Sequence, residues 1–524
     1  MNNNIIKKGF ALAMAAAPLL GQAQEKKNVL FIAVDDLKPV LACYGAEQIQ
    51  TPNIDRLAKM GVVFTNNHCQ QAVCAPSRAS LLTGVRPDST KVWDLKTKIR
   101  VKNPDILTLP QHFKNQGYIT TGVGKIYDKR SVDAKHDRVS WSEAFAFKGD
   151  DKFMDQEQGE PVLGHYQLAK TKELVEKYTK EAQQKNKRKG AVNKYVMKHV
   201  KPSTECADLP DNAYGDGVLA LSAINRLERL SKQDQAFFLA VGFKKPHLPF
   251  VAPKKYWDLY DRDKLPLAPY QKFSENGPKL AYHKSGEIQS YSDIPKLESY
   301  SDIGPDLLPE AKQRELIHGY YAAVSYMDAQ VGKVLNALDS LGLRENTVIV
   351  LWGDHGWHLG DHGLWCKHTN FEQATRSPLI FSAPKCKKGI HVDAPTEFVD
   401  IFPSLCELSG IDTPEDLAGT SLVPILKGKK KSVKKYAVSQ FRRGKAMGYA
   451  FRTERYRYVV WMGNHYRTTK AFQKELVVAE ELYDYQKDKL ETRNVLNDKG
   501  YKKVREEMQA YSLEFFKKGM KTTK

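Results

Sequence analysis

Near its N-terminus the chain contains the stretch Asn28-Val29-Leu30-Phe31-Ile32-Ala33-Val34-Asp35-Asp36. Six consecutive apolar residues, several of them β-branched, predict a strand that is buried on both faces, as in a parallel sheet. The strand ends at two adjacent carboxylates, which are costly at that position unless a cation neutralises them. A hard divalent ion with oxygen ligands would do so; a solvated turn is the alternative.

Three further apolar runs are followed by charged or imidazole side chains. They are Tyr118–Val123 before Lys125, Phe237–Phe243 before Lys244, Lys245 and His247, and Val348–Trp352 before Asp354 and His355. In open α/β sheets, ligands bind at the carboxyl ends of the strands. Four strands that end in this way therefore predict one shared site.

Apolar residues at helical spacing over Pro309–Leu341 and Tyr214–Leu230 predict helices between these strands. The alternation predicts an α/β fold, with a mainly parallel central sheet flanked by helices. The polar, lysine-rich stretch 128–212 predicts an inserted surface lobe. The stretch 256–308, with its Pro and Tyr residues, predicts long loops of the kind that often cover a site.

The composition changes near residue 425, where Lys427–Lys431 forms a basic connection. Beyond it we expect three antiparallel strands, over Lys435–Gln440, Ala446–Arg452 and Tyr456–Met462. A short strand at Leu482 and a closing helix over Asp498–Lys517 are expected to follow. We therefore expect a large catalytic domain over 24–424 and a smaller α+β subdomain with an antiparallel sheet over 425–524.

The first 23 residues have the pattern of a signal peptide, with Lys7-Lys8, an apolar run Phe10–Leu20 and Gly21-Gln22-Ala23 before the expected cleavage point. The run is too short to span a bilayer, so we expect export to a periplasm or beyond and no membrane anchor. A buried N-terminal helix is the alternative. The net charge of +20 favours polyanionic partners. Seven cysteines, an odd number, leave at least one unpaired.

A second stretch, Cys74-Ala75-Pro76-Ser77-Arg78-Ala79-Ser80-Leu81-Leu82-Thr83-Gly84, predicts a tight loop that enters a helix. Pro76 fits the first helical turn and Gly84 can end the helix. Cys74 would then lie at the helix N-terminus, where anions are favoured, and Arg78 adds a cation one turn later. The pattern predicts a reactive sulfur in an anion site, or else an ordinary buried cysteine.

This eleven-residue pattern resembles the signature of type I sulfatases, whose cysteine is oxidised to formylglycine. The resemblance covers nearly the whole mature chain and is closest to the iduronate-2-sulfatase branch, through Val34–Pro39, Gln70–Arg78, Val241–His247 and Asp354–Trp357. It implies an alkaline-phosphatase/sulfatase-like fold for the large domain. It also implies a hydrated aldehyde as the nucleophile and a formylglycine-generating enzyme as a partner.

The resemblance assigns roles to particular residues. One calcium ion would be bound by five groups: Asp35, Asp36, Asp354, His355 and the modified Cys74. Four residues would serve the reaction: Arg78 by holding the formylglycine, Lys125 and Lys367 by holding the sulfate oxygens, and His247 by protonating the departing sugar oxygen. Three residues are candidate substrate contacts: Trp357, Arg442 and Arg443. For Trp357, packing in the core is an equal alternative.

The chain departs from the family at position 128. The family pattern Gly-Lys-x-x-His would place a histidine there, whereas Gly124-Lys125-Ile126-Tyr127 is followed by Asp128. Asp128 could act as the base that regenerates the aldehyde, although a carboxylate is a weaker base, with an ordinary pKa of about 3.9 against about 6.5. It could instead be a surface turn residue, with His136 or another group as the base.

The combined expectation is an exported sulfatase that acts on a sulfated oligosaccharide or polysaccharide, and not on nucleic acid. A uronate 2-O-sulfate or related site in glycosaminoglycan or algal polysaccharide fragments is the expected target. Two alternatives are a phosphate or phosphonate ester hydrolase of the same superfamily, and a non-catalytic protein that binds polyanions.

Overall fold

The computed structural model describes residues 26–185, 187–297, 300–301, 304–463 and 472–519. The expected signal peptide, residues 1–23, lies outside the described residues. All seven cysteines lie within them and are free thiols. No helix in the described ranges is both long and apolar enough to cross a membrane.

The centre of the large domain is a seven-stranded sheet in the order β14-β2-β13-β10-β1-β6-β4. Its strands are β1 (Asn28–Val34), β2 (Val62–Phe64), β4 (Ile119–Gly124), β6 (Phe237–Phe243), β10 (Thr347–Gly353), β13 (Leu379–Ser382) and β14 (Ile390–Val392). The four neighbours β10, β1, β6 and β4 are parallel, and they are the four strands predicted from the sequence. Only β13 runs antiparallel to its neighbours, which confirms the mainly parallel sheet.

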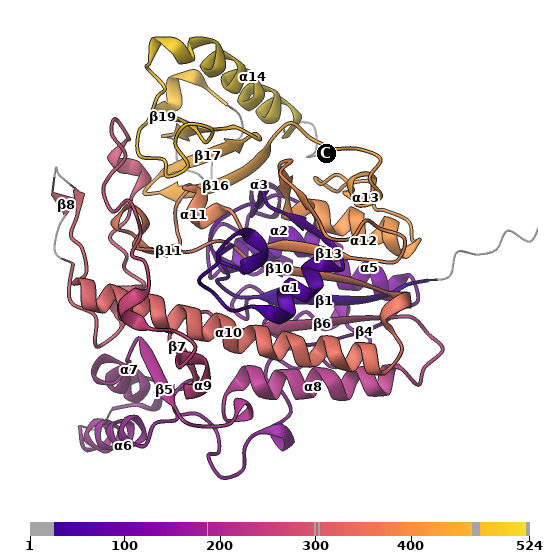
Figure 1. Ribbon diagram of the computed structural model, residues 1–524, viewed down its shortest axis with the longest axis vertical. Coiled ribbons are helices and arrows are strands. Elements are labelled where there is room, and N and C mark those ends of the chain that lie inside the picture. The colour runs from indigo at the N-terminus through magenta and orange to yellow at the C-terminus, as the bar shows by residue number, and fades with distance from the viewer. Residues whose placement is uncertain (1–25, 186, 298–299, 302–303, 464–471, 520–524) are drawn as a thin grey trace, which may run out of the picture.

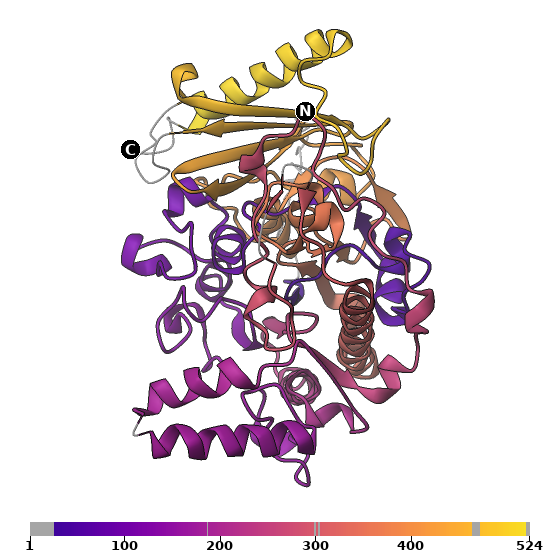
Figure 2. The ribbon, with the colours of Figure 1, turned by 90° about the vertical axis from the view of Figure 1, so that its left-hand side faces the viewer.

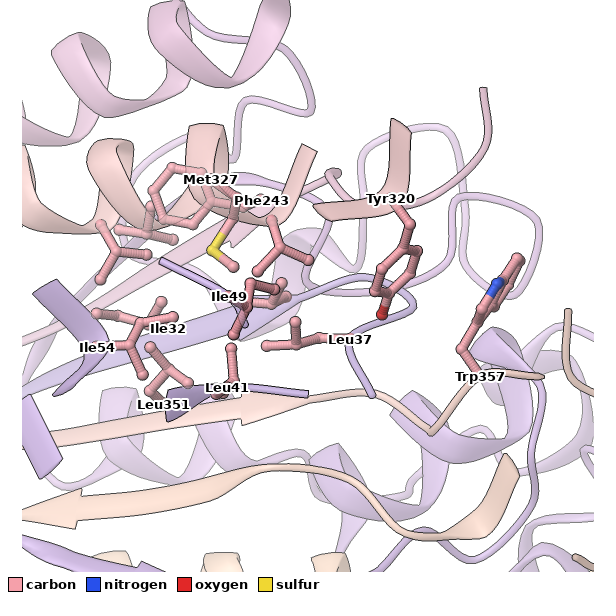
Figure 3. Close-up of a cluster of buried hydrophobic side chains, with 14 of the residues drawn as sticks. Ile32, Leu37, Leu41, Ile49, Ile54, Phe243, Tyr320, Met327, Leu351 and Trp357 are labelled. Carbon is pink, nitrogen blue, oxygen red and sulfur yellow. The ribbon is translucent and has the colours of Figure 1, made fainter. Parts of the chain in front are cut away.

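Helices cover both faces of this sheet (Figure 1). On one face lie α8 (Gly215–Leu230) and α10 (Glu310–Ser340); on the other lie α2 (Cys74–Thr83), α5 (Leu109–Asn115) and α12 (Ile401–Ser409). Because side chains of a strand alternate between faces, Ile32 of β1 packs in the α8–α10 core and Phe31 in the α2–α12 core. Figure 3 shows the first core, with Ile32 and Leu351 of the sheet near Met327 of α10.

The C-terminal part contains a four-stranded antiparallel sheet covered by a helix. Its elements are β16 (Ala437–Arg443), β17 (Ala446–Arg452), β18 (Tyr456–Met462), β19 (Val477–Asp484) and α14 (Lys502–Gly519). The first three strands and the closing helix agree with the prediction. The strand at Leu482 is longer than expected, with eight residues, because its half-buried first half continues the pairing with β18.

The stretch 128–212 contains α6 (Ala169–Gln184) and α7 (Lys189–His199), which lie side by side (Figure 2), and β5 (Thr204–Ala207), which pairs with β7 (Phe250–Pro253). The remaining α-helices are α1 (Pro52–Lys59), α3 (Pro87–Thr90), α4 (Ile99–Lys102), α9 (Lys254–Trp257), α11 (Glu372–Thr375) and α13 (Val423–Leu426). The remaining strands are β3 (Asn67–His68), β8 (Tyr300–Ser301), β9 (Gly304–Pro305), β11 (His358–Leu359), β12 (Trp365–Cys366) and β15 (Thr396–Glu397).

Candidate active site

The register of the central sheet brings the four predicted strand ends together. Val34 of β1 pairs with Gly353 of β10 on one side and with Phe243 of β6 on the other. The residues that follow these strands therefore leave the sheet at the same edge. They are Asp35 and Asp36, Asp354 and His355, and Lys244 to His247, with Lys125 after the neighbouring β4.

Asp35 lies between two cations. The Nζ atom of Lys125 is 2.6 Å from Asp35 Oδ2, and Nη2 of Arg78 is 3.2 Å from Asp35 Oδ1. Arg78 also donates from Nε to Asp354 at 2.9 Å, so it connects the ends of β1 and β10. Burial raises the pKa of Asp35, but Lys125, His247 and Arg78 outweigh it and hold the pKa well below its usual value.

Cys74 begins α2 directly after the extended residue Val73, as predicted, and only 1% of its surface is exposed. The segment before it is held by β16, since Ser439 Oγ donates to the carbonyl of Cys69 at 2.6 Å and the Gln440 amide to that of Gln70 at 2.8 Å. Burial raises the pKa of the Cys74 thiol well above its usual value, despite nearby cations. An unmodified Cys74 therefore remains protonated and is a poor nucleophile at neutral pH.

Four buried groups could hold a metal ion: Asp36, Cys74, Asp354 and His355, whose ligand atoms lie within 4.8 Å of one another. His355 Nδ1 donates to the carbonyl of Gly356 at 2.9 Å, so in the neutral ring Nε2 is an acceptor. Nε2 lies 3.3 Å from Asp36 Oδ1 and 3.6 Å from Asp354 Oδ1. Acceptors that face one another in this way fit a cation between them.

Asp35 belongs to a second such group, with Asp36 and His247. Its oxygens already accept from Lys125 and Arg78, as described above, so the structure places it at the margin of the four-residue group. All five predicted metal ligands thus lie at one edge of the sheet.

Lys367 bonds both oxygens of Asp36, at 2.9 and 3.0 Å. It also bonds Glu287 Oε1 at 2.9 Å, a residue that the sequence analysis did not identify. His247 Nε2 is 3.7 Å from Asp36 Oδ2 and 3.8 Å from Glu287 Oε1. Glu287 lies in the stretch 256–308, where no periodic pattern marks a functional residue.

Asp128 is buried, with 1% exposed, so the structure contradicts the interpretation as a surface turn residue. Its carboxylate accepts two bonds from Arg130, at 2.8 and 2.7 Å, and Oδ2 lies 3.9 Å from Lys125 Nζ. Burial raises the pKa of Asp128, but Arg130 and Lys125 lower it to about 2. The carboxylate is therefore at the site but is a weaker base than an ordinary aspartate.

Trp357 does not reach the substrate space. Its side chain is fully buried, packs near Tyr320 and Phe250, and has the ammonium of Lys367 4.7 Å from its ring centre. Figure 3 shows Trp357 and Tyr320 beside the aliphatic core. The predicted stacking of Trp357 on a sugar is therefore wrong, because no face of the indole is open.

The two predicted arginines of β16 are half-buried. Arg443 donates to the carbonyl of His368 at 2.7 Å and to that of Leu280 at 3.3 Å, which places it next to the loop that holds Lys367. Arg442 precedes it in β16, where successive side chains point to opposite faces of the sheet. Arg443 is thus tied to the active-site loop.

A cavity of about 380 Å³ adjoins these groups. Its wall includes Asp35, Lys125, Asp128 and His247, and it continues along residues of the stretch 128–212, such as His165. A substrate in this cavity would meet Lys125 and His247 directly.

Comparison with known proteins agrees with this geometry. The family model described as Sulfatase matches residues 27–411, and the one described as N-sulphoglucosamine sulphohydrolase, C-terminal, matches 360–518. Mouse iduronate 2-sulfatase is 33% identical over 94% of this chain and 95% of its own length. A sulfatase of Formosa agariphila is 30% identical over 93% and 86%.

Solved structures share the fold. One in complex with its substrate D-glucosamine-2-N,6-O-disulfate has a TM-score of 0.66 at 22% identity, over 95% of this chain and 99% of that one. A phosphonate monoester hydrolase from Silicibacter pomeroyi has a TM-score of 0.68 at 22% identity, over 94% and 96%. Taken with the relatives above, the fold and the site define a sulfuric ester hydrolase. The chain belongs to the sulfatase family, with iduronate 2-sulfatases among its relatives.

Proposed function

We propose that this chain is an exported sulfatase that hydrolyses a sulfate ester of a sulfated saccharide. The observation that carries the proposal is a buried cysteine at the N-terminus of α2, near enough to Lys125 and Lys367 for their charges to oppose the rise in its thiol pKa, with Arg78 one turn later in the same helix. Iduronate 2-sulfatases among the relatives favour a uronate 2-O-sulfate or related position, in glycosaminoglycan or algal polysaccharide fragments.

Cys74 is proposed to be converted to formylglycine by a sulfatase-maturing enzyme. The raised pKa of its thiol supports this, because a protonated thiol cannot attack an anionic ester. A hydrated aldehyde at position 74 would supply one hydroxyl as nucleophile and a second whose deprotonation releases sulfate. Arg78 is fixed by Asp35 and Asp354 beneath this position and would orient it.

Asp36, Asp354 and His355, with residue 74, are proposed to hold one calcium ion, and Asp35 lies beside them. The ion would cancel part of the charge of the sulfate group. Lys125 and Lys367 would bind the sulfate oxygens, since they contact the adjacent Asp35 and Asp36 and both of their charges act on the Cys74 thiol. Such preorganised donors are typically worth roughly 2.7–4 kcal/mol each in the transition state.

His247 is proposed as the acid that protonates the leaving sugar oxygen. Its Nδ1 donates to the carbonyl of Leu248 at 2.6 Å, so the ring is fixed with Nε2 toward Asp36 and Glu287. A sugar alkoxide is a poor leaving group, and an imidazolium at this place would supply the proton it needs.

Peptide mass spectrometry of active protein tests the proposal. The peptide with Cys74 should be lighter by about 18 Da, the difference between a thiol and an aldehyde, while the peptide with the buried Cys406 in the same digest should be unchanged. Full sulfatase activity with an intact Cys74 thiol would refute the mechanism. A desulfation screen over sulfated uronate, hexosamine and algal saccharides would identify the substrate.

A phosphate or phosphonate ester hydrolase is the second candidate, because phosphonate monoester hydrolases share the fold. Metal analysis separates the two, with one calcium expected for the sulfatase and two zinc ions for the alternative. Absence of turnover on every sulfate and phosphonate ester tested would favour a non-catalytic protein that binds polyanions.

A further inference from the structure

The cavity beside Lys125 contains more positive than negative side chains. Its wall has six basic side chains, Lys125, Lys129, Arg130, Lys148, Lys244 and Lys245, and four carboxylates, Asp35, Asp128, Asp151 and Glu160. Three of these carboxylates are already paired: Asp35 with Lys125 and Arg78, Asp128 with Arg130, and Glu160 with Lys148. The excess of cations therefore lies elsewhere on the wall.

Lys129 and Lys244 carry this excess. Neither makes an ion pair with another described residue, and both ammonium groups lie over the ring of Phe147, at 5.7 and 4.8 Å from its centre. Burial lowers the pKa of Lys244, Asp216 partly opposes this, and the ammonium groups of Lys125 and Lys129 lower it further. Both ammonium groups thus lie at the cavity wall without an ion-pair partner among the described residues, where an anionic group of a ligand could pair with them.

The positions of these groups are fixed by the backbone. Ala146 forms a parallel bridge to Val123 of β4, which places Phe147 beside the strand that ends at Lys125. Asp216 at the start of α8 accepts from the backbone N–H of Lys244 at 3.0 Å and thus holds the turn after β6. Lys129 directly follows Asp128, which is held by Arg130. Lys244 thus directly follows β6, Phe147 follows the residue that is bridged to β4, and Lys129 is an exposed residue five positions beyond the end of β4.

We propose that Lys129 and Lys244, seated on Phe147, form a subsite for a second anionic group of the substrate. The group would be a carboxylate or a further sulfate on the saccharide whose sulfate ester lies at Lys125. This inference rests on the proposed function and narrows its substrate class to saccharides with at least two negative groups. A neutral sugar or aryl group would leave both lysines without a partner.

The test compares two kinds of substrate. A 2-O-sulfated uronate disaccharide carries a carboxylate besides the ester, whereas 4-nitrophenyl sulfate carries no second anion. For Lys129→Gln and for Lys244→Gln, kcat/KM on the disaccharide should fall about tenfold or more, mainly through KM, because a charge-assisted contact is lost. The loss on the aryl sulfate should be several-fold smaller.

Lys152→Gln is the matched control, because Lys152 is an exposed lysine 4.8 Å over the ring of Phe153 and is not among the residues of the cavity wall. It should leave both substrates within about twofold of wild type. Two further substrates identify the anion. If wild type and the lysine variants have similar kcat/KM on the carboxyl-reduced disaccharide, the subsite binds the carboxylate. If the variants still have a lower kcat/KM than wild type on a disulfated hexosamine, the subsite binds sulfate.

Equal losses on the disaccharide and the aryl sulfate, or no loss on either, would overturn the subsite. If wild type hydrolyses neither these two substrates nor any ester of the desulfation screen, the proposed function fails, but the subsite remains testable by calorimetric binding of the disaccharide. Wild type should then bind it about tenfold or more tightly than the Lys129→Gln/Lys244→Gln double variant. Equal binding, or none by wild type, would overturn the subsite independently of activity.

Discussion

At the scale of single residues, the site depends on acceptors that face one another. His355 points its Nε2 atom at Asp36 and Asp354, while its Nδ1 is bound to a carbonyl oxygen. Lys367 already donates to both oxygens of Asp36, and Arg78 donates to Asp354, so a proposed metal ion would share these acceptors with two side-chain cations. The proposed metal ion would thus add its charge to a site that two basic side chains already partly neutralise.

Asp354→Asn should reduce both bound calcium and activity, because it removes one charged oxygen ligand. Elemental analysis of calcium per chain and steady-state turnover measure the two effects. Asp328→Asn is the control, since Asp328 is equally buried but bonds the backbone N–H of Ile54 at 2.7 Å, away from the site. Wild-type turnover by Asp354→Asn without bound metal would disprove the assignment.

Asp128→Asn tests the departure at position 128. If Asp128 removes the proton that releases sulfate, the variant should form about one equivalent of desulfated sugar in a burst, followed by a steady state slower by roughly 10²-fold or more. Rapid-quench product formation measures both phases. An unchanged steady-state rate without a burst would show that Asp128 only holds Arg130. The lowered pKa of Asp128 and its hydrogen-bonded oxygens favour this second role.

At the scale of elements, α2 ends where the sequence predicts. Gly84 has a φ of 69°, and a Cβ there would lie 2.5 Å from Leu417 Cδ2. Gly84→Ala should therefore lower the free energy of unfolding by more than the roughly 1 kcal/mol of backbone strain alone. Gly45→Ala is the control, since Gly45 has a φ of 89° but no atom within 4 Å. Denaturant unfolding of both variants separates the backbone strain from the steric overlap. Equal losses in the free energy of unfolding for Gly84→Ala and Gly45→Ala would contradict the expectation.

The sequence predicted the elements whose burial is uniform. All seven residues of β1, β6 and β10 are buried, so each forms an unbroken apolar run. The short strands β2, β13 and β14 have three or four residues, and their place is set by pairing with distant segments. Glu287 was missed for the same reason: its partner Lys367 lies 80 residues away, and neither local pattern indicates the contact.

At the scale of the whole molecule, Glu397 joins the large domain to the C-terminal sheet. It bonds Arg86 at 2.6 and 2.9 Å, Lys434 at 2.6 Å and the backbone N–H of Val438 in β16 at 2.9 Å. Burial raises the pKa of Glu397, but Arg86 and Lys434 outweigh it and hold the pKa well below its usual value. The ionised form therefore stabilises the folded chain.

Glu397→Gln should destabilise the protein by roughly 3 kcal/mol at neutral pH, because the half-buried Arg86 loses its carboxylate partner and Lys434 keeps only Asp400. The stabilisation is fully present above the unfolded-state pKa of about 4.3 and is lost as the pH falls toward the lower folded value. The difference in melting temperature from wild type should thus shrink below about pH 4. Glu176→Gln, which breaks an exposed pair with Lys180, should change little at any pH; a pH-independent difference for Glu397→Gln would contradict this account.

The contacts from β16 to the residues before Cys74 also fix an order of events in time. Ser439 and Gln440, which hold the carbonyls of Cys69 and Gln70, are translated about 370 residues after the cysteine, or roughly 20 to 70 s later at 5–20 residues per second. Until they emerge, the segment that ends at Cys74 lacks its last support. The thiol is 1% exposed in the folded chain, so the proposed maturing enzyme would have to reach it before the chain has folded around it. Under that proposal, faster folding would shorten the time available for conversion, and the rate of chain synthesis would affect the yield of active protein.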